Sequence, residues 1–264
     1  TWRFRYEPNV RLLEREFWLE GAEPEGFVPM QVPSVWQTQG YDRPQYTNIR
    51  YPFPFDPPYV PYENPCGVYV RSFYLEKRPG KAYELYCEGV DSCGYIWING
   101  HFVGYRQGAY DTVGFAVCFL VLKWCDGSYI EDQDKFRFSG IFRSVYLLER
   151  DERHIRDIKV TTAIRGGRAE IGAECSFSRP GAETAVGYAL LSPEGERLAE
   201  GEASGGGLCL TVDGPRLWTA ETPELYTLLL HCGTEYIAQR VGIREVRIAE
   251  DLSVRVNGQS VTFN

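Results

Sequence analysis

Short runs of alternating apolar and polar residues, separated by Gly, Pro, Asn and Asp, recur along the chain. No segment longer than about ten residues shows a convincing helical period, and the best short candidate is the stretch NVRLLEREFW. Alternation of this kind places every second side chain on one face of a strand. Together with 14% aromatic residues, the pattern predicts an all-β protein built from β-sandwiches.

Three turns within this pattern predict hairpins. Asn99-Gly100 lies between two β-rich runs, and Asn257-Gly258 repeats the arrangement later in the chain. Both residue types tolerate the positive φ angles of a type I′ turn. The stretch ALLSPEGERLAEG predicts a third hairpin with a longer turn.

A proline-rich stretch interrupts the alternating runs. Half of the 16 prolines fall between Pro33 and Pro65. Proline has no backbone N–H to donate, so this stretch cannot be an internal strand of a sheet. Because it is also dense in Tyr, Phe and Trp, it is too apolar for a solvated linker. We expect an ordered, irregular loop that packs on the protein, either as a covering flap or as part of a ligand site.

Length and composition predict two domains. The chain has 264 residues, and single hydrophobic cores stop growing at roughly 250 to 300 residues. Its character changes after Arg150 at a charged junction, LLERDERHIRDIKV, and about seven short alternating strands follow. We therefore expect a first β-sandwich over residues 1–150 and an immunoglobulin-like β-sandwich over residues 151–248.

Charge and hydropathy exclude several classes of protein. The net charge of -8 repels polyphosphate, and no basic stripe overcomes it, so nucleic acid is not an expected partner. No apolar run approaches the roughly 18 residues that span a bilayer, so no membrane is expected either. The eight cysteines lack paired C-x-x-C spacing, and most lie in apolar runs. We interpret them as small buried hydrophobic residues in a reducing, cytoplasmic compartment.

The three histidines, His101, His154 and His231, are far apart in the sequence and have no second metal-binding residue beside them. A zinc site is therefore not expected.

The densest polar stretch, KWCDGSYIEDQDKFRFSGIFR, holds four carboxylates: Asp126, Glu131, Asp132 and Asp134. They could accept hydrogen bonds from sugar hydroxyls, bind a hard cation, or form a solvated strand edge neutralised by basic residues. Glycosidase catalysis needs two carboxyl groups about 5 to 5.5 Å apart for retention, or about 6.5 to 9.5 Å for inversion. Residues three apart on a strand face opposite ways, so Glu131 and Asp134 are a poor catalytic pair. We predict no catalytic residue in this chain.

Three sequence blocks, in order, carry a resemblance to a known family. The first is the proline-rich stretch with YTNIRYPF, the second is GVDSCGYIWINGHFVGYRQG, and the third is LKWCDGSYIEDQDKFRFSGIFR. Together they resemble the β-galactosidase branch of glycoside hydrolase family 2. LWTAETPELYTLLL and QRVGIREVRI are similar to the end of the family's immunoglobulin-like domain, and the resemblance covers nearly all of the chain.

The resemblance implies a jelly-roll sugar-binding domain at residues 1–150, an immunoglobulin-like domain at 151–248, and lead-in strands at 249–264. A (β/α)₈ barrel that carries the catalytic glutamates would follow. The chain begins at Thr1 without an initiator Met and stops at Asn264, so we expect a non-catalytic N-terminal fragment of a longer protein. The parent would hydrolyse terminal β-D-galactosides with retention, use Na⁺ and Mg²⁺, and form a homo-oligomer. The partners of this fragment would be the galactoside and its own catalytic barrel.

Two residues match family positions that reach the substrate. Asn48, in YTNIRYP, resembles an asparagine that contacts the sugar from the proline-rich loop, and Asp134 resembles an aspartate that contacts the sugar and ligates a sodium ion. An amide can donate and accept hydrogen bonds, and an ionised carboxylate can accept from a hydroxyl while it holds a hard cation. Glu131 and Asp132 are expected to be structural.

The sequence also departs from the family pattern. It is shorter than the family between GYRQGAYDTVGF and VLKWCDGSY, which puts the fold of residues 105–122 in doubt, and Phe136 stands where the family has tryptophan. Other functions stay open. They are a stand-alone carbohydrate-binding module, a structural or adhesive pair of sandwiches, and the related β-glucuronidase or β-mannosidase activities.

Overall fold

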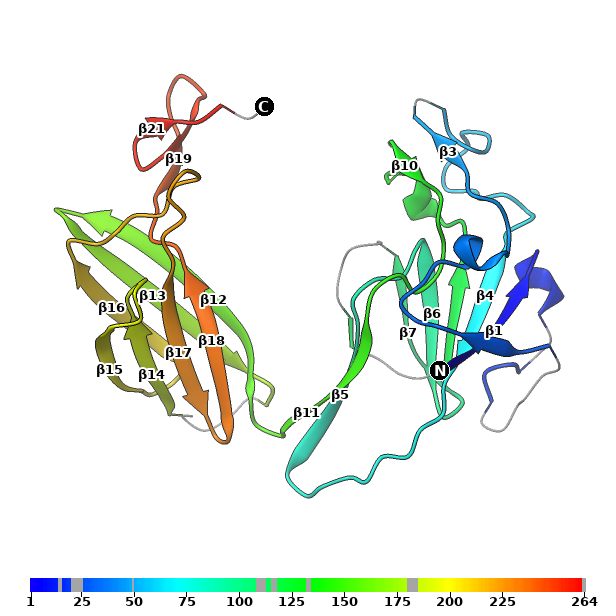
Figure 1. Cartoon of the computed structure of the whole chain (residues 1–264), viewed down its shortest axis with the longest axis horizontal. Helices are drawn as coiled ribbons and strands as arrows, with labels where there is room; N and C mark the ends of the chain where they lie inside the picture. Colours follow the sequence, from blue (N-terminus) through cyan, green and yellow to red (C-terminus); the bar gives the residue numbers. More distant parts are fainter. Residues whose placement is uncertain are drawn as a thin grey trace. The chain divides into compact units, whose positions relative to one another are not determined.

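The computed structural model describes residues 1–13, 16–19, 26–48, 50–107, 113–114, 118–131, 134–179 and 185–262. Its regular elements are strands and three short 3₁₀ helices, which confirms the all-β prediction. The chain forms two compact units, one from Thr1–Arg78 and Tyr83–Glu149 and the other from Pro79–Ala82 and Arg150–Asn264 (Figure 1).

The first unit is a β-sandwich whose larger sheet has six antiparallel strands in the order β2-β1-β4-β9-β6-β7. A second sheet has the order β11-β5-β8. The strands of the larger sheet are β1 (Trp2–Glu7), β2 (Val28–Met30), β4 (Cys66–Val70), β6 (Cys93–Ile98), β7 (His101–Gln107) and β9 (Cys118–Leu122). Those of the smaller sheet are β5 (Lys81–Cys87), β8 (Val113–Gly114) and β11 (Val145–Asp151).

An aromatic core fills the first sandwich. Phe4 and Trp36 are fully buried, with ring centroids 6.3 Å apart. Their rings fit against β4 because that strand carries Gly67, where a Cβ atom would lie only 2.6 Å from Phe4 and 2.8 Å from Trp36. The absence of a side chain at Gly67 therefore sets how closely the rings approach the sheet.

The shortened stretch at residues 105–122 is described only in part. β7 extends to Gln107, and β9 pairs with β4 on one side and β6 on the other. β8 has two residues and pairs with β5. Residues 108–112 and 115–117 lie outside the described ranges. The central strand β9 is thus present despite the departure from the family pattern.

The second unit begins with seven strands in two sheets, as the sequence predicted. Their orders are β12-β13-β16 and β15-β14-β17-β18. Alternate residues of β17 are buried, so that Leu228 and Leu230 point into the core. The strands are β12 (Ile155–Arg165), β13 (Arg168–Phe177), β14 (Val186–Leu191), β15 (Arg197–Ala203), β16 (Gly207–Asp213), β17 (Tyr226–Cys232) and β18 (Glu235–Val241).

A small three-stranded sheet follows this sandwich in the sequence. It has the order β19-β20-β21, with strands β19 (Val246–Ile248), β20 (Val254–Val256) and β21 (Gln259–Ser260). These strands fall largely in the segment that the sequence assigned to the lead-in of a barrel.

The three predicted hairpins are confirmed. β6 and β7 are joined by Asn99-Gly100 with φ angles of 47° and 81°, and β20 and β21 by Asn257-Gly258 with φ angles of 51° and 80°. β14 and β15 form the third hairpin. In the stretch NVRLLEREFW, the best short candidate for a helix, Val10–Leu12 forms a 3₁₀ helix, η1, and Glu14 and Arg15 lie outside the described residues.

All eight cysteines lie within the described residues and are free. Seven are buried, which confirms their interpretation as core residues. Cys209 is exposed, contrary to the general expectation, because β16 is an edge strand and Cys209 alternates with the inward-facing Leu208 and Leu210. No helix of the described part is long and apolar enough to cross a membrane.

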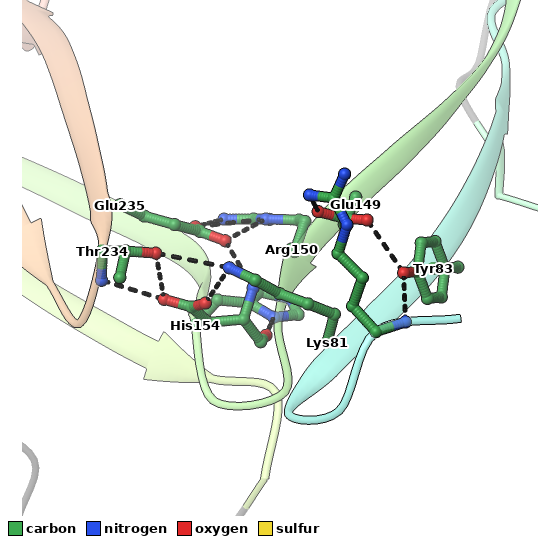
Figure 2. Close-up of polar contacts among 9 residues, drawn as sticks. Lys81, Tyr83, Glu149, Arg150, His154, Thr234 and Glu235 are labelled. Carbon is green, nitrogen blue, oxygen red and sulfur yellow. Dashed lines mark hydrogen bonds and ion pairs between the residues drawn. The ribbon is translucent and has the colours of Figure 1, made fainter. Parts of the chain in front are cut away.

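A polar network ties three segments of the second unit together (Figure 2). Lys81, from the segment 79–82, pairs with the Asp151 carboxylate, which also accepts hydrogen bonds from the Thr234 amide at 2.9 Å and the Thr234 hydroxyl at 2.7 Å. Beside it, Arg150 pairs with Glu235 at 2.6 Å. The start of the unit is thereby fastened to the turn between β17 and β18.

Candidate functional site

The proline-rich loop packs on the acid block, as its composition predicted, and Tyr129 is the main anchor. Tyr129 ends the 3₁₀ helix η3 (Asp126–Tyr129). Its hydroxyl donates to the Tyr59 carbonyl at 2.5 Å and accepts from the Asp56 amide at 3.2 Å. The ring packs edge-on against Phe53 and Phe55, with centroids 5.2 and 5.4 Å away. The loop is therefore held by specific contacts and not by burial alone.

A second anchor lies at the end of the loop, where the Asn64 side chain bonds to both backbone groups of Trp124. Its side-chain amide donates to the Trp124 carbonyl at 2.8 Å, and its side-chain oxygen accepts from the Trp124 amide at 3.0 Å. Both residues are buried. Next to them, the Lys123 ammonium group pairs with Asp42 at 2.5 Å. An amide side chain that satisfies two backbone groups in the interior fixes the chain in one register.

A third anchor joins the start of the loop to the segment after the acid block. The Gln37 side-chain oxygen accepts from the Ser139 amide at 2.9 Å, and the Gln37 side-chain nitrogen donates to the Ser139 hydroxyl at 3.3 Å. Trp36, in the 3₁₀ helix η2 (Trp36–Gln39), adds a backbone hydrogen bond to the Ser139 carbonyl at 3.0 Å. The loop is thus attached at its start, middle and end.

The two predicted site residues come together at one end of this assembly. The strand β3 (Tyr46–Thr47) pairs with β10 (Lys135–Phe136), with Thr47 opposite Lys135. Asn48 directly follows β3 and Asp134 directly precedes β10, so both lie where this short ladder ends. Both are exposed. Each can therefore present its polar atoms to a ligand outside the ladder.

Tyr46 positions Asp134. The Tyr46 hydroxyl donates a hydrogen bond to Oδ1 of Asp134, and this bond raises the pKa of Tyr46. Asp134 itself has a left-handed backbone, with φ of 48°, directly before the chain enters β10. Aspartate tolerates this conformation better than most residues. Sequence reasoning missed Tyr46, although it lies two residues before Asn48 in the same block.

Charged side chains surround Lys135, the residue of β10 that lies opposite Thr47 in the ladder. Lys135 lies 2.9 Å from the buried Asp91 and 3.9 Å from Glu131. Arg137 is buried beside them; burial lowers its pKa, and the nearby carboxylates of Asp91 and Glu131 oppose that effect. Glu131 thus has the basic partner that a structural role implies, whereas Asp132 lies outside the described residues. Asp91 was missed because it joins the site only through the pairing of residues distant in sequence.

For a cation bound at Asp134, this chain would supply the Asp134 carboxylate as one ligand. The carboxylate is a hard oxygen ligand of the kind that Na⁺ and Mg²⁺ prefer. The described residues hold no group of three or more His, Cys, Asp and Glu side chains that could bind a metal ion. Asp134 fits as one ligand of such an ion, and the remaining ligands would have to be backbone or amide oxygens, water, or groups outside this chain.

A surface groove of about 880 Å³ lies elsewhere, in the second unit. It is lined by Gly187 and Ala189 of β14, His231 of β17 and Tyr236. It contains neither Asn48 nor Asp134.

Comparison with known families identifies the class of protein. The sequence matches the model of the glycosyl hydrolases family 2 sugar binding domain over residues 1–151 and that of glycosyl hydrolases family 2 over residues 153–244. The chain belongs to glycosyl hydrolase family 2, which confirms the resemblance found in the sequence.

Its similar relatives are β-galactosidases. The chain is 44% identical to the β-galactosidase of Actinobacillus pleuropneumoniae over 88% of this chain and 24% of that protein. It is 40% identical to the β-galactosidase of Staphylococcus xylosus over 98% of this chain and 27% of that protein. The chain therefore spans about a quarter of the length of the curated relatives that it matches.

Solved structures share the fold. A β-glucuronidase of an uncultured Clostridium species matches with a TM-score of 0.70 at 17% identity, over 98% of this chain and 46% of that one. A Ruminococcus gnavus β-glucuronidase matches with a TM-score of 0.70 at 20% identity, over 100% of this chain and 47% of that one. At these identities the likeness shows a common architecture and not a common substrate.

Proposed function

We propose that this chain is the N-terminal part of a β-galactosidase that hydrolyses terminal β-D-galactosides with retention, and that Asn48 and Asp134 contact the sugar. The observation that carries the site proposal is their placement, since both residues lie at the end of one anchored ladder. The identities of 44% and 40% to two β-galactosidases support the choice of galactoside over other sugars.

The proposed role of these residues is recognition. The Asn48 amide can donate to one hydroxyl oxygen and accept from another hydroxyl, and the Asp134 carboxylate can accept from a hydroxyl while Tyr46 holds its other oxygen. Retaining hydrolysis needs two carboxyl groups about 5 to 5.5 Å apart, and we assign these to the part of the parent that follows this chain. A sodium ion at Asp134 would neutralise the carboxylate and orient it. No Mg²⁺ site is assigned to the described residues.

The proposal is testable in a chimera. Residues 1–264 replace the equivalent N-terminal quarter of the Staphylococcus xylosus β-galactosidase, and kcat/KM is measured on a chromogenic β-galactoside. We expect an active chimera, and a loss of roughly ten- to a hundred-fold in kcat/KM for Asn48→Ala and for Asp134→Ala, the loss produced by removing one or two hydrogen bonds to substrate. The chain of 264 residues alone should be inactive.

Asp126→Asn is the matched control. Asp126 is an exposed acid of the same block, eight positions before Asp134. Its substitution by Asn should leave kcat/KM unchanged. If both site variants behave like this control, the site assignment is wrong. If the chimera cleaves β-glucuronides or β-mannosides in preference, the sugar assignment is wrong. Tight galactose binding by the 264-residue chain in calorimetry would instead favour a stand-alone binding module.

Compartment and assembly belong to the same proposal. Seven buried free cysteines support a reducing, cytoplasmic location for the parent, because oxidising compartments favour disulfides.

We further propose that the parent is a homo-oligomer. Light scattering on the chimera tests the assembly, and a monomeric mass for an active enzyme would contradict it.

A further inference from the structure

One sheet of the second unit carries the groove of about 880 Å³ on its outer face. This sheet has the order β15-β14-β17-β18 (Figure 1), and its inner face packs on the core through residues such as Leu190 and Leu228. Successive side chains of a strand point to opposite faces, so the residues that alternate with these core residues point outward. The strand register sets the outward residues in rows across the sheet, and two neighbouring rows are Glu202, Gly187, His231, Tyr236 and Glu200, Ala189, Leu229, Ala238.

The floor of the groove has almost no side-chain bulk. Gly187 and Ala189 lie on β14, between the strands β15 and β17 that carry larger residues in the same rows. A Cβ atom on Gly187 would lie 3.5 Å from the ring of His231, so the floor and the neighbouring ring are adjacent. The backbone of β14 is therefore open to a flat ligand, and the groove has the volume of a small-molecule site.

The two walls of the groove differ in chemistry. His231 and Tyr236 form an aromatic wall, because they pair in the register of β17 and β18 and their rings stack with centroids 4.3 Å apart and planes 19° from parallel. Tyr236 is 77% exposed. The polar wall consists of Glu200, Glu202 and Arg197, of which Arg197 donates to Glu200 at 2.5 Å. This second wall thus offers both acceptors and donors.

The combination fits a neutral saccharide. A pyranose ring has C–H bonds on its faces, which can pack on an aromatic ring, and hydroxyl groups around its rim, which both donate and accept hydrogen bonds. A cationic ligand would favour carboxylates alone, whereas the Arg197 guanidinium group neutralises part of the polar wall. An amphipathic helix would need an apolar groove, and one wall of this groove is charged.

We propose that this groove binds a neutral oligosaccharide, with one sugar ring against the aromatic wall and its hydroxyl groups bonded to the polar wall. The groove lies in the second unit, whereas Asn48 and Asp134 belong to the first. The inference therefore does not depend on the function proposed for those two residues. Such a site holds a carbohydrate chain without taking part in its hydrolysis, and thereby raises the concentration of carbohydrate around the protein.

NMR titration of the 264-residue chain tests the site. The probes are three neutral tetrasaccharides, β-1,4-galactotetraose, cellotetraose and maltotetraose, added to protein labelled with ¹⁵N. We expect at least one of them to bind with a Kd of about 1 mM, because a groove on an exposed face makes few buried contacts. The amide shifts should change mainly in β14, β15, β17 and β18. Saturation-transfer difference spectra should show the strongest contact at the C–H protons of one sugar ring.

Variants of the aromatic wall separate stacking from general surface binding. The double variant His231→Ala with Tyr236→Ala should weaken binding about five-fold, whereas Tyr236→Phe, which keeps both rings, should bind like the parent protein. Tyr74→Ala is the matched control, because Tyr74 is 92% exposed and belongs to the first unit. Asn48→Ala should also bind like the parent protein, so failure of this proposal and failure of the proposed sugar contact at Asn48 are distinguishable.

Three results would overturn the proposal. They are no binding of any tetrasaccharide at about ten times the expected Kd, shift changes that map outside the groove, and undiminished binding by a folded double variant. Shifts in the same four strands that grow with protein concentration without any sugar would also overturn it, because they would assign the groove to a second copy of the chain. The site is mapped on the parent protein as well, so a variant that fails to fold does not decide the outcome.

Discussion

Two asparagines of the first unit have opposite roles, which a single kind of substitution can separate. Asn64 is buried and satisfies both backbone groups of Trp124, whereas Asn48 is exposed at the end of the β3–β10 ladder. Asn64→Ala leaves a buried N–H and a buried C=O without their partner, so we expect a loss of about 2 to 4 kcal/mol in the free energy of unfolding. Asn48→Ala should change it by less than about 0.5 kcal/mol. Urea unfolding followed by tryptophan fluorescence measures both, and equal losses would contradict these roles.

The meeting of Asn48 and Asp134 could not be derived from spacing. Both residues were selected by their match to a family pattern, and local alternation says nothing about which distant segments pair. The ladder that joins them depends on the anchors at Tyr129, Asn64 and Gln37, each of which bonds across a long stretch of sequence. Composition did predict that the loop packs on the protein, although Phe55, Tyr59 and Tyr62 of the loop stay exposed.

Strand glycines give a prediction at the scale of the element. In β4, a Cβ on Gly67 would lie 2.6 Å from Phe4 and 2.8 Å from Trp36, both fully buried, so Gly67→Ala forces the rings or the strand to move. We expect a loss of about 2 kcal/mol in the stability of the first unit. In β16, a Cβ on Gly207 meets nothing within 4 Å, and its φ is not in the left-handed range. Gly207→Ala should be neutral or slightly stabilising in the same denaturant assay.

The local elements were predictable where a turn determines them. Asn99-Gly100 and Asn257-Gly258 specify hairpins because their positive φ angles match the twist of the flanking strands. The order of the larger sheet was not predictable, because β4 lies between β1 and β9 through pairings that no local pattern encodes. The same holds for Gly67, which looks like any strand glycine until the aromatic rings that cover it are known.

At the scale of the whole molecule, the chain enters the second unit twice. The change in sequence character near Arg150 marks the main entry, but residues 79–82 also belong to this unit, in which Lys81 pairs with Asp151. Pro79-Gly80 predicts a turn before β5, but no sequence signal places Lys81 and Ala82, the first residues of β5, in another unit than the rest of that strand. Within the second unit, the polar network of Figure 2 joins Lys81 to Asp151 and Thr234.

This network should make the second unit sensitive to acid. Hydrogen bonds from Lys81 and then Thr234 lower the pKa of Asp151. Burial alone would raise the pKa of Glu235, but hydrogen bonds from Arg150 and the Asp151 amide outweigh it, so that this pKa is lowered too. A carboxyl group with a lower pKa in the folded than in the unfolded state contributes its full stability above the unfolded value of about 4. That contribution is lost as the pH falls through the folded value.

We therefore expect Asp151→Asn to lower the thermal midpoint of the second unit at about pH 7, and the difference from the parent protein to shrink steadily between about pH 4 and pH 2. Asp213→Asn is the control, because Asp213 is 73% exposed and pairs with a similarly exposed Arg168. Such surface pairs contribute little, so this variant should follow the parent curve at every pH. Thermal unfolding monitored by circular dichroism gives the curves. If the difference in thermal midpoint between Asp151→Asn and the parent protein stays constant down to pH 2, the contacts of Asp151 stabilise the unit without any contribution from the charge of its carboxylate.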